Sequence, residues 1–170
     1  MTDILRQANI KTKNHLMAFP DSSWQDCPDT GRSTGAYNIF YQGGPIDHGT
    51  HVSGPVAQSS VESEYNAACT AGMVLAHFRM LVHELLNEDP YMVPKEAPLI
   101  VLDSKSAMCM ANNGKDTKHT RHIARRMNFV RNGEKCKMHN ISWCEGGLKL
   151  AFSLLCGWYV WYPYYICGHT

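Results

Sequence analysis

The sequence predicts one mixed α/β domain in which strands come first and helices alternate with strands later. Two observations carry this prediction. A long helical pattern begins at Ser59, and the candidate strands ahead of it are separated by hairpin-type turn signals. After the helix, Leu99–Asp103 is apolar up to its last residue, as in a strand buried on both faces of a sheet. Hairpins followed by crossovers are typical of a mixed sheet with flanking helices.

Three strands are expected before the long helix. The first covers Leu16–Phe19 and runs into a loop rich in turn residues. The second covers Ala36–Tyr41. Gly43-Gly44-Pro45 then signals a turn, and we expect a third, hairpin-connected strand over about His51–Gln58.

The long helix opens with a capping box, in which Ser59 and Glu62 satisfy each other's orphan backbone N–H groups. Apolar residues then recur at helical spacing as far as an expected end near Asn87 to Pro90. The later expected elements are a short helix from Ser104 or Ser106 through Met110, a helix over about Thr120–Arg131 that stops before Asn132-Gly133, and a strand over Met138–Cys144.

The length of 170 residues, 44% of them apolar, allows one domain with a substantial core. We expect a lead-in over 1–14, the domain over 15–150 and a divergent hydrophobic and aromatic tail over 151–170. The uncharged stretch Leu150–Thr170 reaches transmembrane length, but its many tyrosines and tryptophans indicate an interfacial cluster, so no membrane insertion is expected.

Charge and cysteine content narrow the function classes. A formal net charge of +1 excludes a globally basic nucleic-acid binder, although the average can hide a charged segment. The seven cysteines are an odd number, and no signal peptide precedes them. We therefore expect an intracellular protein, cytoplasmic or nuclear, and not a secreted one.

Several motifs follow one another in a fixed order. They are Asp21-Ser22-Ser23-Trp24, Gly31 to Tyr37, Gly43-Gly44-Pro45-Ile46, Ser59 to Tyr65, Leu102 to Ala107, Thr120-Arg121-His122-Ile123 and Phe129-Val130-Arg131. In this order, over about Leu16 to Leu150, the chain resembles the ribonuclease H domain of copia-type LTR retrotransposon Pol polyproteins. The resemblance implies a ribonuclease H-like fold with a mixed five-stranded sheet. It also implies two-metal hydrolysis of the RNA strand of RNA/DNA hybrids with Mg²⁺ or Mn²⁺, and a reverse transcriptase domain upstream.

Three carboxylates are candidates for holding the ions, because hard divalent cations prefer oxygen ligands. Asp21 and Asp103 each end a predicted strand, and they meet at the carboxyl edge of the sheet if those strands are parallel neighbours. Glu62 and Glu64 compete for the third position. Since Glu62 is the capping partner of Ser59, we assign Glu64 as the ligand. The resemblance gives Asp21, Glu64 and Asp103 the catalytic and metal-binding roles, with Asp21 shared by both ions.

The family's fourth carboxylate is the Asp of an Ala-Asp-Ile-Leu-Thr-Lys segment. Here Ala151 is followed by Phe152, where the match stops. A cation held by too few carboxylates binds weakly and activates its water less, so we expect impaired cleavage. The alternative is a catalytically inactive relic or nucleic-acid-binding module of the same fold. The change over 152–170 indicates a frameshift, a retained intron or a mis-assigned terminus, or else an authentic hydrophobic tail.

A basic segment and small polar residues are candidates for binding the hybrid. Eight of the sixteen Lys and Arg residues lie between Lys115 and Lys137, and they give the predicted helix Thr120–Arg131 a basic face for phosphates or a merely solvated one. Small polar side chains are suited to sensing 2′-hydroxyls. The nucleic-acid-binding candidates are Arg32, Ser33, Thr34, Asn112, Lys118, Arg121, His122, Arg125 and Arg126.

Two further patterns are interpreted as structural. Cys136, His139 and Cys144 fit no common zinc-ligand spacing. Trp24 and Trp143 are expected to pack in the core or a loop rather than to stack on bases.

Overall fold

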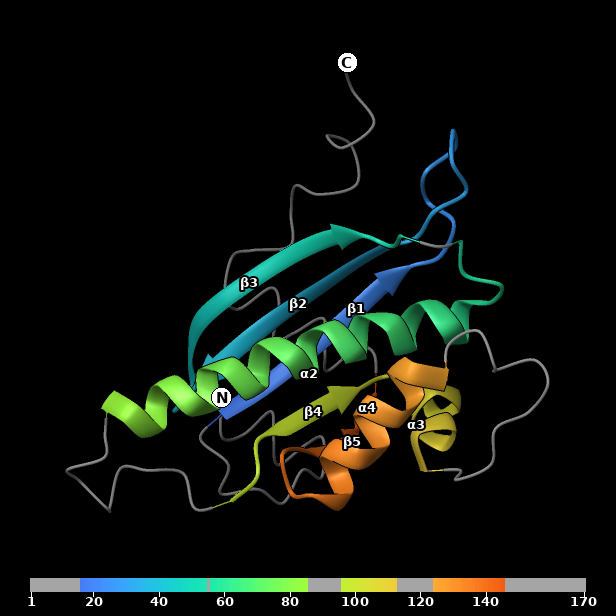
Figure 1. Ribbon diagram of the computed structural model, residues 1–170. Coiled ribbons are helices and arrows are strands. Elements are labelled where there is room, and N and C mark those ends of the chain that lie inside the picture. The colour runs from blue at the N-terminus through green and yellow to red at the C-terminus, as the bar shows by residue number, and fades with distance from the viewer. Residues whose placement is uncertain (1–15, 55, 86–95, 113–123, 146–170) are drawn as a thin grey trace.

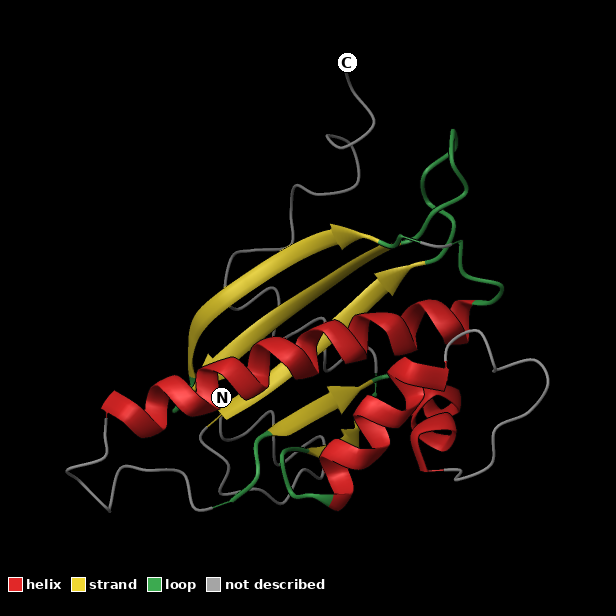
Figure 2. Cartoon of the chain, in the orientation of Figure 1, coloured by secondary structure: helices red, strands yellow, loops and turns green. Residues whose placement is uncertain are grey.

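The fold is one mixed sheet with its helices arranged beside it (Figures 1 and 2). The computed structural model describes residues 16–54, 56–85, 96–112 and 124–145. Within them the elements are β1 (Leu16–Ser23), β2 (Thr34–Tyr41), β3 (Gly44–Val52), α2 (Ser60–Leu85), β4 (Leu99–Leu102), α3 (Lys105–Asn112), α4 (Ala124–Lys135) and β5 (Asn140–Trp143). The strand order is β3-β2-β1-β4-β5. The expected mixed five-stranded sheet is confirmed.

The sheet changes from antiparallel to parallel at β1. The first three strands form an antiparallel meander, whereas β1 pairs with β4, and β4 with β5, in parallel. A parallel neighbour needs a crossover, and α2 supplies the one from β3 to β4. Because β1 and β4 lie side by side, the carboxyl ends of both strands open on the same edge of the sheet (Figure 1).

The third strand lies earlier than expected. It starts at Gly44, directly after a two-residue hairpin loop in which Gln42 and Gly43 both have positive φ. Pro45 is tolerated because β3 is an edge strand of the sheet. The prediction of a strand over 51–58 was therefore wrong apart from its first two residues. The glycines and the proline of this edge strand resemble the composition of a loop.

Helix α2 packs along one face of the sheet. Its small residues Ala68 and Ala71, with Leu75, pack in the same buried cluster as Ala18 and Ile100. Small side chains on this helix face allow the backbone to approach the strands closely, and the burial of these apolar groups holds the two layers together. The helix begins where the capping box placed it, while its expected end near 87–90 lies outside the described residues.

Helix α4 continues through the Asn132-Gly133 pair that was expected to end it, and it reaches Lys135. The stop signal fails because Gly133 is buried against the imidazole ring of His139, which leaves no room for a β-carbon. The glycine thus serves close packing rather than a turn. The expected start of this helix over 120–123 lies outside the described residues.

The lead-in over 1–14 and the tail over 151–170 also lie outside the described residues, so the proposed domain boundaries stay predictions. Among the helices that the structure describes, none is long and apolar enough to span a membrane.

Candidate metal centre

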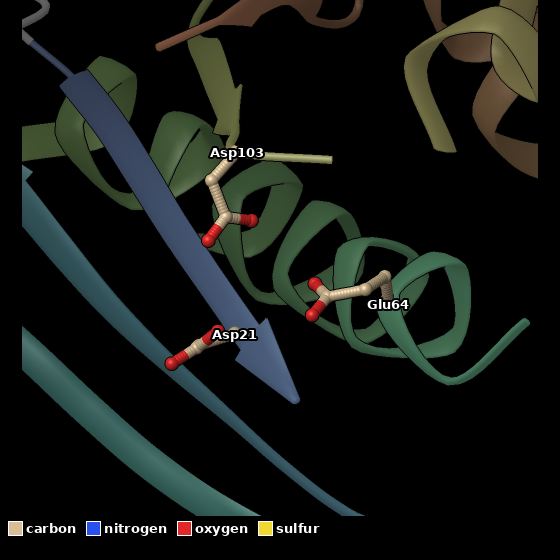
Figure 3. A group of neighbouring side chains, drawn as sticks. All are labelled: Asp21, Glu64 and Asp103. Carbon is tan, nitrogen blue, oxygen red and sulfur yellow. The ribbon is translucent and has the colours of Figure 1, made fainter. Parts of the chain in front are cut away.

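Three carboxylates from three separate elements converge at the open end of the sheet. Asp21 lies on β1, Glu64 on the first turns of α2, and Asp103 directly after β4. One carboxylate oxygen of each lies within 4.8 Å of those of the other two, and all three side chains are half-buried (Figure 3). This is the only group of three or more potential metal ligands among the described residues.

The two aspartates meet because of strand register. Ala18 of β1 is the partner of Ile100 of β4, and both strands run in the same direction. Asp21 and Asp103 each lie three residues beyond this pair, so both carboxylates fall near the carboxyl ends of neighbouring parallel strands. The four apolar residues of β4 are buried, and Asp103 is the first polar residue after them. Its side chain therefore falls at the edge of the sheet.

The two glutamates at the start of α2 lie in different environments, as expected. The Oγ of Ser59 accepts a hydrogen bond from the backbone N–H of Glu62 at 3.2 Å. The Glu62 carboxylate accepts one from the backbone N–H of Gln58 at 2.9 Å, one residue before the expected partner. Glu62 is only 3% exposed and is committed to the start of the helix. Glu64 instead joins the aspartates.

The donor set suits a hard divalent cation. All three ligands are carboxylate oxygens, the donors that Mg²⁺, Mn²⁺ and Ca²⁺ prefer over nitrogen or sulfur. Oxygens on opposite sides of one Mg²⁺ stand about 4.2 Å apart at ordinary Mg–O distances. Neighbouring oxygens on one octahedral Mg²⁺ stand only about 3 Å apart, so the three carboxylates, whose oxygens lie within 4.8 Å of one another, must move closer together to share one ion. Position 152, where the family has a fourth carboxylate, lies outside the described residues.

The loop after Asp103 is held by two further contacts. The Oγ of Ser104 accepts the backbone N–H of Ala107 at 3.1 Å and so caps α3. The indole N–H of Trp143 donates to the backbone carbonyl of Asp103 at 2.9 Å. Sequence reasoning treated Trp143 as a packing residue and missed this contact, because the contact depends on β4 and β5 being neighbours.

The nucleic-acid-binding candidates are distributed unevenly. Ser33 is fully buried and its hydroxyl accepts the backbone N–H of Gln25, so this side chain supports its own loop, and its assignment to nucleic acid stays a prediction. Arg32 is exposed beside it, and Thr34 is half-buried with its N–H bonded to Asp26. Polar side chains in this loop thus support the turn itself.

On the helical side, Asn112 at the end of α3 and Arg125 on α4 are exposed. Arg126 is half-buried, and its positive charge helps burial to lower the pKa of His51 and opposes the burial that raises the pKa of Cys69. Of the two arginines, Arg125 is therefore the more accessible to a ligand. The other candidates, Lys118, Arg121 and His122, lie outside the described residues.

The remaining residues with possible chemistry have structural roles. His139 is buried with Nε2 3.1 Å from the carbonyl of Val130, and Cys136 is exposed. Among the described residues, neither belongs to a group of three or more possible metal ligands. The indole N–H of Trp24 donates to the carbonyl of Ala57 at 3.1 Å, which holds the loop after β1.

No protein-family model and no curated protein sequence matches the chain. Solved structures match it by fold. Ribonuclease H1 from the halophilic archaeon Halobacterium salinarum NRC-1 superposes with a TM-score of 0.50 at 14% identity, over 75% of this chain and 81% of that one. The N-terminal ribonuclease H domain of rv2228c from Mycobacterium tuberculosis gives 0.51 at 9% identity, over 79% and 90%. The chain has the ribonuclease H fold, as the sequence resemblance implied.

Proposed function

We propose that the chain is a metal-dependent endonuclease of the ribonuclease H type, which hydrolyses the RNA strand of RNA/DNA hybrids. One observation carries the proposal: Asp21 and Asp103 lie near the carboxyl ends of two neighbouring parallel strands, and Glu64 reaches them from α2. In open α/β sheets, ligands generally bind outside the carboxyl ends of the strands, which is where the three carboxylates converge.

The chemistry follows from the ligand set. Divalent ions, once bound, neutralise the charge of the scissile phosphate and make a water nucleophilic at neutral pH. Asp21, Glu64 and Asp103 would hold them, and Asp21 would be the ligand common to both. The protein's own contribution is to orient these carboxylates, which sit on a strand, a helix and a strand end rather than on long loops.

The substrate and origin are proposed on two grounds. The order of motifs from Leu16 to Leu150 resembles copia-type Pol polyproteins, so we place the chain in a retroelement, downstream of a reverse transcriptase domain and inside the cell. Exposed cations at Arg32 and Arg125 offer contacts for phosphates of a hybrid. Asn112, at the end of α3, is a candidate for sensing 2′-hydroxyls.

A second candidate function is favoured by one residue. Phe152 stands where the family has its fourth carboxylate, so the chain can be a binding module or relic that retains the fold and holds hybrid without turnover. This function predicts hybrid binding without cleavage. Restoring the carboxylate by Phe152→Asp, together with a family-like segment after it, would then restore cleavage.

The deciding experiment incubates the protein with an RNA/DNA hybrid labelled on the RNA strand, with Mg²⁺, with Mn²⁺ or with a chelator. We expect metal-dependent cuts within the RNA strand and no cuts in the same RNA paired with RNA. Asp103→Asn should abolish cleavage. Asp29→Asn removes the same charge from an exposed turn and should leave cleavage unchanged. Hybrid binding by anisotropy without any cleavage would favour the second function, and absence of both would contradict the two together.

A further inference from the structure

The structure ties a residue of β5 to the backbone of a candidate metal ligand. The indole N–H of Trp143 donates to the carbonyl oxygen of Asp103 at 2.9 Å, across 40 positions of sequence. Both groups are half-buried, so the bond is partly shielded from competing water. The contact is made to the backbone of Asp103 and therefore constrains the orientation from which its carboxylate projects.

This bond lies where the β-ladder stops. Leu102 and Trp143 form the last register pair between β4 and β5, and the backbone N–H of Cys144 donates to the carbonyl of Leu102 at 2.8 Å. Beyond that pair, the next carbonyl along the chain is that of Asp103, directly after β4. The side chain of Trp143 supplies the donor for it, and so extends the restraint of the sheet by one residue onto the ligand.

The indole ring is itself held in place. The ammonium of Lys105 lies 4.4 Å from the ring centroid, within the range of a cation–π interaction. Lys105 is the first residue of α3, whose start is fixed by the Ser104 cap. The backbone is thus restrained on both sides of Asp103. The pairing of β4 with β5 holds Leu102 before it, and the capped start of α3 holds Lys105 after it.

We propose that Trp143 is a positioning residue for the carboxylate centre, which fixes the Asp103 backbone through its indole N–H while Lys105 holds the ring in that orientation. The inference rests on the proposed function in one respect, namely that Asp103 binds a cation. Groups that orient a metal ligand typically contribute about tenfold to a hundredfold to metal affinity. Removal of the Trp143 N–H should therefore weaken binding without removing any ligand.

The sequence offers a direct test of the bond without metal. Aspartate is followed by serine at only two places, Asp21-Ser22 and Asp103-Ser104, and both belong to the candidate site. Protein labelled with ¹³C at the aspartate carbonyl and ¹⁵N at serine gives one NMR cross-peak for each. In metal-free protein, Trp143→Phe should shift the Asp103-Ser104 peak and leave the Asp21-Ser22 peak in place. Lys105→Met should also shift the Asp103-Ser104 peak, but by less than Trp143→Phe does.

The second arm titrates Mg²⁺ into the same labelled samples. We expect Trp143→Phe to weaken Mg²⁺ binding about tenfold. Trp24→Phe is the matched control. It also removes an indole N–H that donates to a backbone carbonyl, that of Ala57, in a hydrogen bond of similar length, but this bond lies outside the carboxylate centre. It should change the Mg²⁺ affinity less than twofold.

The outcomes separate the two proposals. An unshifted Asp103-Ser104 peak in folded Trp143→Phe overturns the hydrogen bond, and unchanged Mg²⁺ affinity in that variant overturns its positioning role while the proposed function stands. If the unsubstituted protein binds no Mg²⁺, the proposed function and the positioning role fall together. If Trp143→Phe does not fold, the metal-free spectrum of Lys105→Met decides. Lys105 is exposed, and loss of its charge over the indole ring should still shift the Asp103-Ser104 peak.

Discussion

Asp21 and Asp103 lie near the carboxyl ends of two neighbouring parallel strands, with carboxylate oxygens within 4.8 Å of each other and of Glu64. Three negative charges at this separation repel one another when no cation is present. Neutralising one charge with Asp103→Asn should therefore raise the unfolding free energy of the metal-free protein by about 1 kcal/mol. Thermal denaturation in chelator measures it. Added Mg²⁺ should stabilise the unsubstituted protein but not the variant, and equal stabilisation of both would contradict a metal site at Asp103.

Glu62 and Glu64 lie two residues apart on α2 and should respond oppositely to the same substitution. Glu64→Gln removes a candidate ligand and should abolish Mg²⁺ binding with little loss of stability. Glu62→Gln weakens the carboxylate's bond to the Gln58 N–H at the helix start, so it should cost about 1 kcal/mol of unfolding free energy while Mg²⁺ binding is kept. Calorimetric Mg²⁺ titration and urea unfolding of both variants test this prediction. If Glu62→Gln lost Mg²⁺ binding and Glu64→Gln lost stability, the two roles would have to be exchanged.

The candidate centre could be predicted because its geometry is encoded locally. Each aspartate ends an apolar run that forms a strand, and the capping box commits Glu62 to the helix start, which leaves Glu64 available. The parallel pairing of β1 with β4 was only a condition of that prediction, and the choice of these three carboxylates also depended on the resemblance in the order of motifs.

The misplaced features depend on contacts between distant parts of the chain. Proline and glycine in β3 resemble a loop until the strand is known to lie at the edge of the sheet. Gly133 resembles a helix stop until His139 is seen packed against it. Ser33, which was expected to contact nucleic acid, is covered by its own loop, and the bond from Trp143 to Asp103 requires β5 to lie next to β4. A pattern of residues along the chain carries no information about these neighbours.

Gly133 should tolerate no side chain. A β-carbon at this position would overlap the buried ring of His139, so the ring or the helix must move. Gly133→Ala should therefore lower the unfolding free energy by about 1–3 kcal/mol, although alanine is the better helix former. The control is Gly54→Ala, because the structure leaves open space around that position. Urea unfolding of both variants tests this, and a neutral Gly133→Ala would contradict the close packing of α4 against the His139 ring.

The buried His139 and the half-buried His51 should make stability fall as the solution is acidified. Burial lowers the pKa of His139 below its ordinary value of 6.5, and burial together with the charge of Arg126 lowers that of His51. The unfolded chain therefore binds protons at a higher pH than the folded one does. Their contribution to stability is complete above about pH 6.5 and is lost as the pH falls through the lowered pKa values of the folded state.

Urea unfolding between pH 8 and pH 5 measures this dependence. We expect the unfolding free energy to decrease below about pH 6.5, and to decrease less steeply in His139→Gln, which cannot titrate at that position. His139→Gln also loses packing against Gly133, so its stability at pH 8 should be lower and only the slope is diagnostic. A slope equal to that of the unsubstituted protein would show that His139 takes up its proton as readily in the folded chain as in the unfolded one.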